Sequence, residues 1–184
     1  MTSAVQDEPD GRRRRGLRRQ ALLIDATLRV VARKGITGVT HRSVATEAGL
    51  PGSAVSHHFA SLDDLLAAAL RSQTEQLVAA MTDPAADRDL GWFAAELVRL
   101  FRDDGDGVAA RYELYLRAAR HPGTRSSVDL WLGLLTDLAR RHTDDPARIT
   151  TCIAAVDGYF VQRIATGTPP DADEVEQILR TTLM

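Results

Sequence analysis

The sequence of 184 residues has little cysteine, few aromatic side chains and no long apolar run. Its one cysteine, Cys152, has no partner for an intramolecular disulfide, which suits a reducing compartment. The apolar runs are far shorter than the roughly 20 residues that a membrane-spanning helix needs. No apolar segment follows the N-terminal arginines, so we expect no export signal. These absences predict a globular protein of the cytoplasm.

Patterns that support catalysis or metal binding are also missing. We find no nucleophile paired with a base, no cluster with metal-ligand spacing and no glycine-rich phosphate loop. His57 and His58 are adjacent, but neighbouring residues of a helix point about 100° apart and do not readily bind one ion together. We therefore expect neither an enzyme nor a protein that binds a cofactor or a metal.

The net charge of −2 conceals two regions of opposite charge. Residues 11–60 hold ten basic and two acidic residues, a net charge of +8, whereas residues 61–184 hold 13 arginines and 20 acidic residues, a net charge of −7. A basic segment attached to an acidic body indicates a polyanionic partner for that segment alone. A solubilising, disordered basic tail is the alternative interpretation, and charge alone does not separate the two.

Apolar residues recur at spacings of three and four through most of the chain, without an alternating strand pattern or a sequence repeat. This periodicity predicts an all-α fold of about nine helices. We expect a disordered arginine-rich arm over residues 1–16, a small helical domain over residues 17–60 and a larger helical body over residues 61–184. Capping residues and Gly or Pro breaks place the helices at about residues 17–34, 41–48, 52–58, 62–81, 88–102, 108–120, 124–141, 146–165 and 173–183.

Two short helices joined at residues 49–51 form a helix-turn-helix pattern. Thr40 is a suitable N-cap for the first helix, although Ser43 stands where a capping box has Glu or Gln. The second helix of such a motif lies in the DNA major groove, and Val55 and Phe59 are expected to face the core instead. Small polar residues let this helix approach the base edges closely and form hydrogen bonds with them. The candidate base contacts are Gly52, Ser53, Ala54, Ser56 and His57.

Four segments of this region follow one another at a characteristic spacing: residues 32–35 (ARKG), 40–49 (THRSVATEAG), 50–59 (LPGSAVSHHF) and 61–66 (SLDDLL). On these segments, residues 19–70 resemble the DNA-binding domain of the TetR family of bacterial regulators. Residues 112–122 look like a segment found in some members of that family. The resemblance implies a homodimer that binds a palindromic operator, usually a repressor that a small ligand releases from DNA. It also implies contacts with phosphates or bases at Thr40, His41 and Arg42.

The sequence departs from the family pattern at two positions. Ser56 stands where the family usually has an aromatic residue, typically Tyr, and Leu62 stands where it often has Lys. Both family residues tend to contact phosphate, so their replacement weakens the expected backbone contacts. The arginines of the N-terminal arm can compensate along the DNA backbone or in a minor groove. These arginines are Arg12, Arg13, Arg14 and Arg15, within the basic run that continues to Arg19.

The central helices carry most of the aromatic residues, which suit either a plain core or an apolar ligand pocket with a few polar groups. Glu113, next to two tyrosines, fits either a buried acid in that pocket or the solvated face of its helix. The resemblance favours a pocket for a small, mainly apolar effector, and the acidic surface of the body does not decide the charge of that effector. The candidate ligand contacts are Trp92, Phe93, Tyr112, Tyr115 and Trp131.

The last two predicted helices have wide apolar faces. These faces can form a two-fold interface with a second chain, or they can cover the core of their own chain. We expect the dimer, which would place two recognition helices about 34 Å apart, and we expect Cys152 to be a small buried hydrophobe. The candidate interface residues are Ile149, Ile153, Val156, Phe160, Val175, Ile178 and Leu179.

The sequence therefore predicts a DNA-binding transcription regulator that responds to a ligand. Effector binding would shift the population of dimers between two separations of the DNA-binding modules, with the helix over residues 62–81 as the lever. A DNA-binding dimer or co-regulator that responds to no ligand is the alternative. A fully packed body would favour that alternative, and a well-formed apolar cavity would favour the first.

Overall fold

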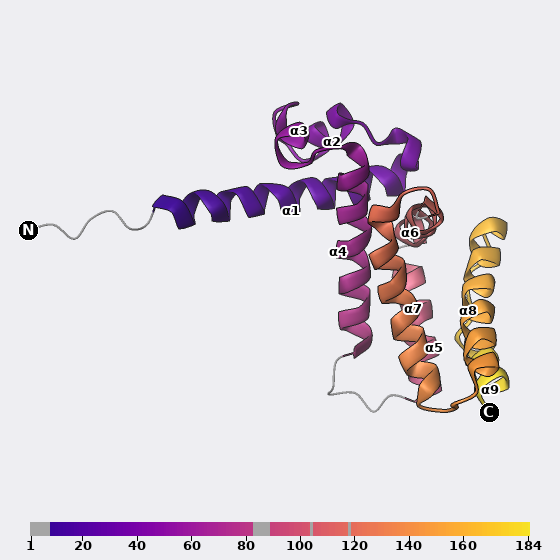
Figure 1. The fold of residues 1–184 in the computed structure, drawn as a ribbon. Helices are drawn as coiled ribbons and strands as arrows, with labels where there is room; N and C mark the ends of the chain where they lie inside the picture. The colour runs from indigo at the N-terminus through magenta and orange to yellow at the C-terminus, as the bar shows by residue number, and fades with distance from the viewer. Residues whose placement is uncertain (1–7, 83–88, 104, 118) are drawn as a thin grey trace, which may run out of the picture.

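The computed structural model describes residues 8–82, 89–103, 105–117 and 119–184. Within these ranges the chain is all-helical, as predicted, with nine α-helices, two short 3-10 helices and no strand (Figure 1). The elements in chain order are α1 (Glu8–Lys34), η1 (Ile36–Gly38), α2 (His41–Glu47), α3 (Ala54–His58), α4 (Leu62–Thr82), α5 (Leu90–Asp103), α6 (Gly105–Arg117), η2 (Pro122–Thr124), α7 (Arg125–Arg140), α8 (Pro146–Thr166) and α9 (Ala172–Leu183).

A first apolar core joins α1, α2 and α3 to the first half of α4. Leu23, Ala26 and Val30 lie at spacings of three and four on one face of α1, and this face is buried as predicted. Helix α6 also contributes to this core, through the fully buried Leu114. One helix of the body is thus part of the core of the N-terminal module. The core also contains Val31, Val39, Val44, Ala45, Val55, Phe59, Leu65, Leu66, Leu70 and Ala110.

A second apolar core fills the body between α4, α5, α7, α8 and α9. Helix α9 packs against both α5 and α8, and α7 packs against α4. Cys152 is buried in this core, as predicted. Helix α4 enters both cores, since Leu65 and Leu70 belong to the first core and Leu77 and Met81 to the second. A displacement of α4 therefore affects both parts of the molecule.

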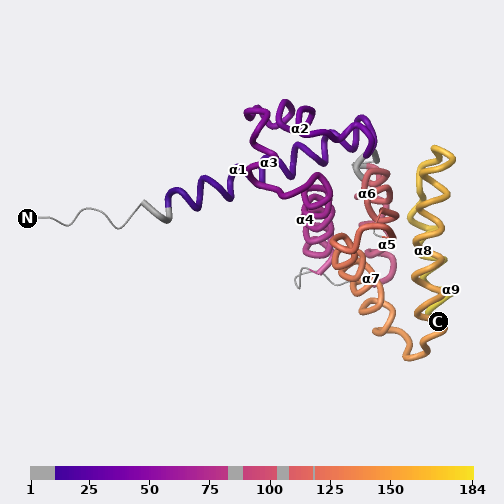
Figure 2. Tube along the Cα trace, turned by 45° about the horizontal axis from the view of Figure 1, so that its top comes forward, coloured from indigo at the N-terminus to yellow at the C-terminus, as the bar shows by residue number. Residues whose placement is uncertain are grey.

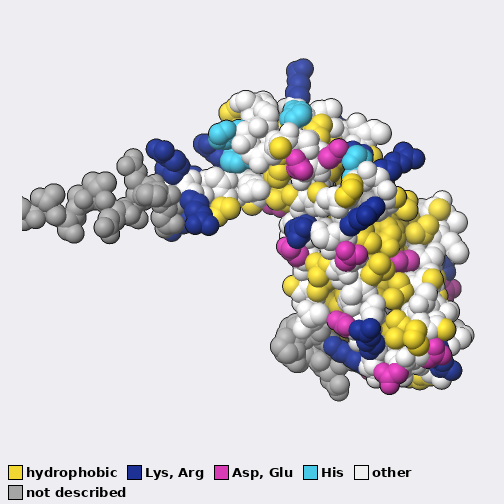
Figure 3. Space-filling view, viewed as in Figure 1, with side chains coloured by type: hydrophobic (Ala, Val, Ile, Leu, Met, Phe, Trp, Pro, Cys, Tyr) yellow, Lys and Arg dark blue, Asp and Glu magenta, His cyan; other side chains and the backbone are white. Residues whose placement is uncertain are grey.

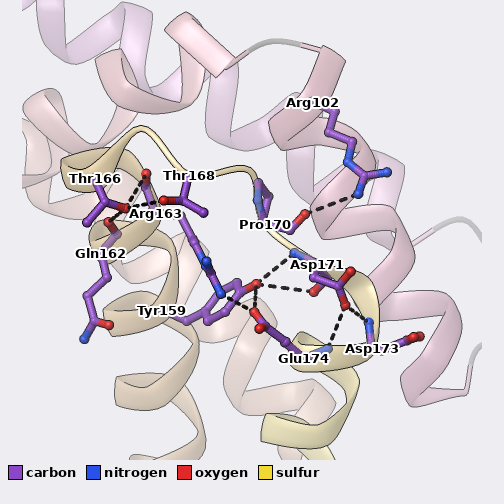
Figure 4. Close-up of polar contacts among 10 residues, drawn as sticks. All are labelled: Arg102, Tyr159, Gln162, Arg163, Thr166, Thr168, Pro170, Asp171, Asp173 and Glu174. Atoms are coloured by element: carbon purple, nitrogen blue, oxygen red, sulfur yellow. Dashed lines mark hydrogen bonds and ion pairs between the residues drawn. The ribbon is translucent and has the colours of Figure 1, made fainter.

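The α8–α9 connection is held by a network of polar contacts (Figure 4). The Asp171 N–H donates to the Tyr159 hydroxyl at 2.8 Å, and that hydroxyl donates to Glu174 at 2.7 Å. Arg163 pairs with the same glutamate and lies over the Tyr159 ring, 4.8 Å from its centroid. Asp171 caps α9 by accepting hydrogen bonds from Asp173 N–H and Glu174 N–H. These contacts fix the angle at which α9 returns along α8.

Two of the expected helices are displaced by about one helical turn or more. Helix α1 begins at Glu8, so the disordered arm predicted over residues 1–16 is helical from residue 8, and residues 1–7 lie outside the described ranges. Arginine is a good helix former, and four consecutive arginines extend the helix despite two glycines. Helix α6 spans Gly105–Arg117, earlier than the predicted residues 108–120. Figures 1 and 2 show the first half of α1 extending away from all other helices.

Four of the predicted dimer contacts are buried inside the chain itself. Val156, Phe160, Val175 and Leu179 belong to the second core, because α8 and α9 turn their most apolar faces towards α5 and towards each other. These four side chains are therefore not exposed for contact with a second chain. The other candidates, Ile149, Ile153 and Ile178, are half-buried at the edge of the core.

Two further classes of feature are missing from the described part of the chain. No helix in these ranges is long and apolar enough to cross a bilayer. No group of three or more His, Cys, Asp or Glu side chains in them is arranged to hold a metal ion.

Candidate DNA-binding surface and effector pocket

The start of α2 is fixed by a reciprocal capping box. The Ser43 N–H donates to Thr40 Oγ1 at 3.0 Å, and the Thr40 N–H donates to Ser43 Oγ at 2.9 Å. The box is therefore complete, and the expectation that serine leaves it incomplete is wrong. The serine hydroxyl replaces the longer Glu or Gln and also donates to Gly38 O at 2.9 Å. His41 and Arg42 follow the cap directly and are both exposed.

The turn between α2 and α3 depends on Gly49. This glycine has a φ of 65°, in the left-handed region that side chains with a Cβ rarely adopt. The fully buried Val55 and the nearly buried Phe59 then anchor α3 in the first core, as predicted. With these two residues turned inward, the outer face of α3 is left to Ser56 and His57.

The predicted recognition positions do gather on this outer face. Ala54 is half-buried, and the other four, Gly52, Ser53, Ser56 and His57, are exposed. Helix α3 begins only at Ala54, so Gly52 and Ser53 lie in the turn that precedes it rather than inside the helix. The Ser56 hydroxyl donates to Ser53 O at 3.1 Å.

His58 lies on the inner side of the same helix end. Its ring is in an edge contact with the His57 ring, with the centroids 5.1 Å apart. Burial, followed by the positive charges of His57 and Arg19, lowers the pKa of His58. At neutral pH this histidine is therefore an uncharged packing group, and His57 is the exposed one.

The arginines of α1 fall into two groups. Arg29 and Arg33 pair with Glu47 of α2, and their hydrogen bonds lower the pKa of that carboxyl. These two arginines therefore connect α1 to α2 within the module. The other group consists of exposed arginines on the protruding half of α1, Arg12, Arg13, Arg14, Arg15, Arg18 and Arg19. Figure 3 shows basic side chains along α1 and over the helix-turn-helix end of the molecule.

Three of the five predicted ligand contacts come together between α4, α6 and α7. Tyr112, Tyr115 and Trp131 line a cavity of about 30 Å³, and Tyr112 and Trp131 also line a second cavity of about 20 Å³. The Tyr112 and Tyr115 ring centroids are 6.2 Å apart. The first cavity is also lined by Leu70, Thr74, Leu77, Arg111, Ser127 and Val128.

The other two predicted contacts lie elsewhere. Phe93 lines a larger groove of about 250 Å³ between α4, α5 and α7, which the exposed Asp129 and Asp137 also line. Trp92 packs half-buried against the second core and lines none of these cavities.

Two polar groups, one in the wall of the first cavity and one that contacts its aromatic residues without lining it, were not predicted. The Ser127 hydroxyl is buried in the wall of the first cavity and has no hydrogen-bond partner among the described residues. The Asp157 carboxylate of α8 accepts hydrogen bonds from the Tyr112 hydroxyl and the Trp131 indole N–H, both at 3.2 Å. The sequence did carry a signal for Asp157, which lies on the apolar face of its helix, four residues after Ile153 and three before Phe160.

Helix α6 links this pocket to the DNA-binding module. Glu113 is exposed, so it lies on the solvated face of its helix and is not a buried acid of the pocket. Its carboxylate accepts a hydrogen bond from the Ile36 N–H at 2.8 Å. Arg117 pairs with Asp63 at the start of α4, and His121 lies 3.3 Å from the same carboxylate. These three contacts connect Glu113, which lies between the two tyrosines in the sequence, to η1, and Arg117 and His121, which follow them, to α4.

Comparison with protein families identifies the chain. The model for bacterial regulatory proteins of the tetR family matches residues 23–69, and the model for the tetracyclin repressor-like C-terminal domain matches residues 85–184. This chain belongs to the TetR family. It is a helix-turn-helix transcription regulator and not an enzyme, and the resemblance in its N-terminal segments is confirmed.

Relatives within the TetR family cover most of the chain. The transcriptional regulator BetI of Rhizobium meliloti is 33% identical over 166 residues, 82% of this chain and 80% of the relative. The regulator PksA of Bacillus subtilis is 37% identical over 178 residues, 88% of this chain and 86% of the relative.

Solved structures of the TetR type are also similar along the chain. A family member from Streptomyces coelicolor, SCO1917, is 38% identical with a TM-score of 0.77, covering 90% of this chain and 98% of the other. The multidrug binding protein EbrR in complex with ethidium is 38% identical with a TM-score of 0.74, covering 89% and 97% of the two chains. Other EbrR structures contain proflavin or malachite green.

Proposed function

We propose that the protein is a repressor that binds a palindromic operator as a homodimer and is released from it by a small, mainly apolar effector. The observation that carries this proposal is the position of α4. Its first half belongs to the core of the helix-turn-helix module, and its second half lines the aromatic pocket. A ligand that displaces α4 must therefore move the module that contacts DNA. The protein would act in the cytoplasm, on the chromosome.

The operator contacts follow from the exposed face of the module. Thr40, His41 and Arg42 at the start of α2 would contact phosphates or base edges, and Ser56 and His57 on α3 would enter the major groove. Gly52, Ser53 and Ala54 would let the backbone approach the bases closely. Ser56 and Leu62 provide no aromatic or lysine contact with phosphate, and Leu62 packs against the first core. Arg12 to Arg15 on the protruding part of α1 would supply that missing charge.

The dimer would form through α8 and α9. Their edge residues Ile149, Ile153 and Ile178 are half-buried, and Val161 of α8 is 45% exposed. Pairing these edges about a two-fold axis would build a four-helix interface. Such an interface would set the distance between the two helix-turn-helix modules.

The effector would enter the pocket that Tyr112, Tyr115 and Trp131 line. EbrR, a relative of similar fold, is a multidrug binding protein whose complexes contain the aromatic dyes ethidium, proflavin and malachite green. The two cavities here hold about 30 and 20 Å³, which is less than such a ring system needs. Binding would therefore displace the α6 rings and α6 with them. The Glu113–Ile36 and Arg117–Asp63 contacts would pass that displacement to the module.

A DNA-binding dimer that responds to no ligand is a second candidate, and the small volume of the cavities favours it. The two aromatic cavities have no room for an effector as long as their side chains stay in place. The two candidates share their DNA surface and differ only in the response of operator affinity to added compounds.

The first test is selection of bound fragments from a genomic DNA library, followed by footprinting. We expect a palindrome whose half-sites lie about 10 base pairs apart, and a sedimentation mass of two 20.1 kDa chains. His57→Ala should lower operator affinity about tenfold, whereas His142→Ala, an exposed histidine of the body, should not change it. If no fragment is enriched even at low salt, the proposal is wrong. If a palindrome is found but no aromatic compound weakens its binding, the second candidate is correct.

A further inference from the structure

A groove lies where the DNA-binding module meets the body, between Leu28 of α1, Gln73 of α4, Leu100 of α5 and Arg111 of α6. We call it the junction groove. Its volume is about 310 Å³, within the roughly 300–1,000 Å³ of small-molecule sites, whereas the two aromatic cavities hold about 30 and 20 Å³. Helix α1 packs against both α4 and α6 in this region (Figure 1). A ligand in the junction groove would therefore contact both parts of the molecule.

Most of the surface of the junction groove is apolar. Leu77 is buried in the second core, whereas Ala80, one turn of α4 further on, is exposed. The groove can therefore be reached from solvent at Ala80, and an apolar group placed in it is removed from water. The apolar lining residues are Leu28, Ala32, Leu77, Ala80 and Leu100.

The charged side chains that line the junction groove are all of one sign. Arg29 and Arg111 line it, and among its described lining residues there is no aspartate or glutamate. Gln73 and Gln76 add two uncharged amide groups. The groove that Phe93 lines is different, because two aspartates and only one arginine line it. The junction groove is therefore suited to an anion.

Arg29 keeps binding capacity although it already has a partner. The Glu47 carboxylate accepts a hydrogen bond from Arg29 Nε at 2.8 Å and pairs with Arg33 as well. One negative charge is thus shared by two guanidinium groups, and these three residues retain a net positive charge. A guanidinium has five N–H donors, so Arg29 can bind Glu47 through Nε and a ligand through its other N–H groups.

Arg111 has the more central position of the two arginines. It lines the junction groove and also both aromatic cavities, so its side chain forms part of the wall between them. It is half-buried, where a charge is less screened by water than on an open surface. A planar guanidinium can donate two parallel hydrogen bonds to one carboxylate. We therefore expect Arg111 to be the main partner of a bound anion, with Arg29 as the second.

We infer that the junction groove binds a small amphiphilic organic anion, whose carboxylate pairs with Arg111 and Arg29 and whose apolar part covers the leucines and alanines of the groove. This site is separate from the proposed effector pocket, and it is defined without DNA. A bound anion would contact α1 and α4 together and would hold the module and the body in the arrangement described here. Because the groove exists only in the folded chain, the anion should also raise the melting temperature.

The first test compares 2-naphthoate with 2-naphthamide, which have nearly the same shape and differ in charge. Each is titrated at pH 7.5 into the full-length protein without DNA, by calorimetry. We expect 2-naphthoate to bind at least about tenfold more tightly, because only the anion forms charge-assisted hydrogen bonds with arginine. Arg111→Gln, which keeps N–H donors but removes the charge, should abolish this preference, and Arg111→Lys should retain part of it. Arg125→Gln, at an exposed arginine of α7, is the control and should change neither affinity.

A second pair of variants locates the bound anion. Ala79 and Ala80 are adjacent and exposed on α4, but only Ala80 lines the junction groove, and neither lines an aromatic cavity. Ala80→Trp fills the groove with an indole and should weaken 2-naphthoate binding at least about tenfold, whereas Ala79→Trp should leave it unchanged. Both variants keep Arg111, so they test the site even if Arg111→Gln does not fold.

Two results would overturn the inference. One is equal affinity of the wild-type protein for the two compounds. The other is 2-naphthoate binding that survives in Ala80→Trp, because the anion would then lie outside the junction groove, in the aromatic cavities if Arg111→Gln abolishes it. Circular dichroism of each variant without ligand first confirms that it is folded. Operator binding is not part of these measurements, so failure of this site and failure of the proposed repressor function are distinguishable.

Discussion

The helix-turn-helix end and the centre of the body differ in how completely their polar groups are paired. At the helix-turn-helix end, the Ser43 hydroxyl joins Thr40 and Gly38, and Glu47 binds two arginines. In the body, the Ser127 hydroxyl is buried without a partner among the described residues, and Asp157 has only neutral donors. Hydrogen bonds and ion pairs thus hold the side chains of the first region in one geometry. The second region retains polar groups that have no partner of opposite charge or no hydrogen bond.

This difference agrees with the tasks that we propose for the two regions. A surface that contacts base edges needs side chains held in one geometry, since a small displacement loses hydrogen bonds. A pocket that must change shape benefits from small cavities and incompletely paired groups, because these make a second packing accessible. The helix that joins the regions, α4, is apolar on the faces that it turns to both cores.

The largest effect on stability should come from the first core. Leu114 of α6 is fully buried there, and Leu114→Ala should lower the free energy of unfolding by about 3 kcal/mol through lost burial and a cavity. Leu116 of the same helix is 70% exposed, and Leu116→Ala should change stability by less than about 0.5 kcal/mol. Urea denaturation measures both. Equal losses in the two variants would mean that α6 does not share the core of the module.

Operator affinity should show the next largest effect, from the arginines of α1. Replacement of Arg12, Arg13, Arg14 and Arg15 by alanine should weaken operator binding by about 10- to 100-fold and reduce the slope of log affinity against log salt by about 2–4. Replacement of the exposed body arginines Arg140, Arg141 and Arg148 is the control and should change neither. Fluorescence anisotropy over a series of salt concentrations measures the slope. An unchanged slope in the first variant would assign these arginines to solubility alone.

The two regions also differ in how far the sequence predicted them. The helix-turn-helix was predictable because its signals are local, since Thr40 caps α2 from one residue away and Gly49 ends it with a positive φ. The start of α1 was misplaced because a run of arginines has no apolar periodicity, although arginine itself favours helix.

The pocket was only partly predictable because its contacts connect distant parts of the chain. Asp157 lies 45 residues from Tyr112 and 26 from Trp131 in the sequence, so no local pattern showed that the three meet. The aromatic composition of the central helices was visible, but it did not separate Trp92 and Phe93 from the tyrosines that line the cavity. Likewise, apolar faces on α8 and α9 did not reveal which partner covers them, and four of the seven predicted contacts belong to the chain's own core.

Replacement of Gly49 should have an intermediate effect on stability, and it tests the rigidity of the helix-turn-helix end. Its φ of 65° is unfavourable for a residue with a Cβ, while the space around an added Cβ is open. Gly49→Ala should therefore cost about 1 kcal/mol of stability through backbone strain alone. Gly52 has similarly open surroundings without a positive φ, so Gly52→Ala should cost less. Thermal unfolding followed by circular dichroism compares the two, and a larger loss at Gly52 would contradict this account of the turn.

The smallest expected effect is the change in melting temperature when a single carboxyl group is replaced. This change should be the most informative, because we expect a decrease at the helix-turn-helix end and an increase in the body. Arg29 and Arg33 lower the pKa of Glu47 in the folded state, so its contribution to stability is present above the unfolded-state pKa and is lost as the pH falls through the folded-state pKa. Burial raises the pKa of Asp157, so its contribution is most favourable at low pH and is lost as the pH rises through the folded-state value. Glu47→Gln should therefore lower the melting temperature at pH 7.5, whereas Asp157→Asn should raise it by roughly 2–4 °C, and both differences should shrink towards pH 3. A melting temperature of Asp157→Asn below that of the wild-type protein at pH 7.5 would mean that the carboxylate stabilises the body through its hydrogen bonds with Tyr112 and Trp131.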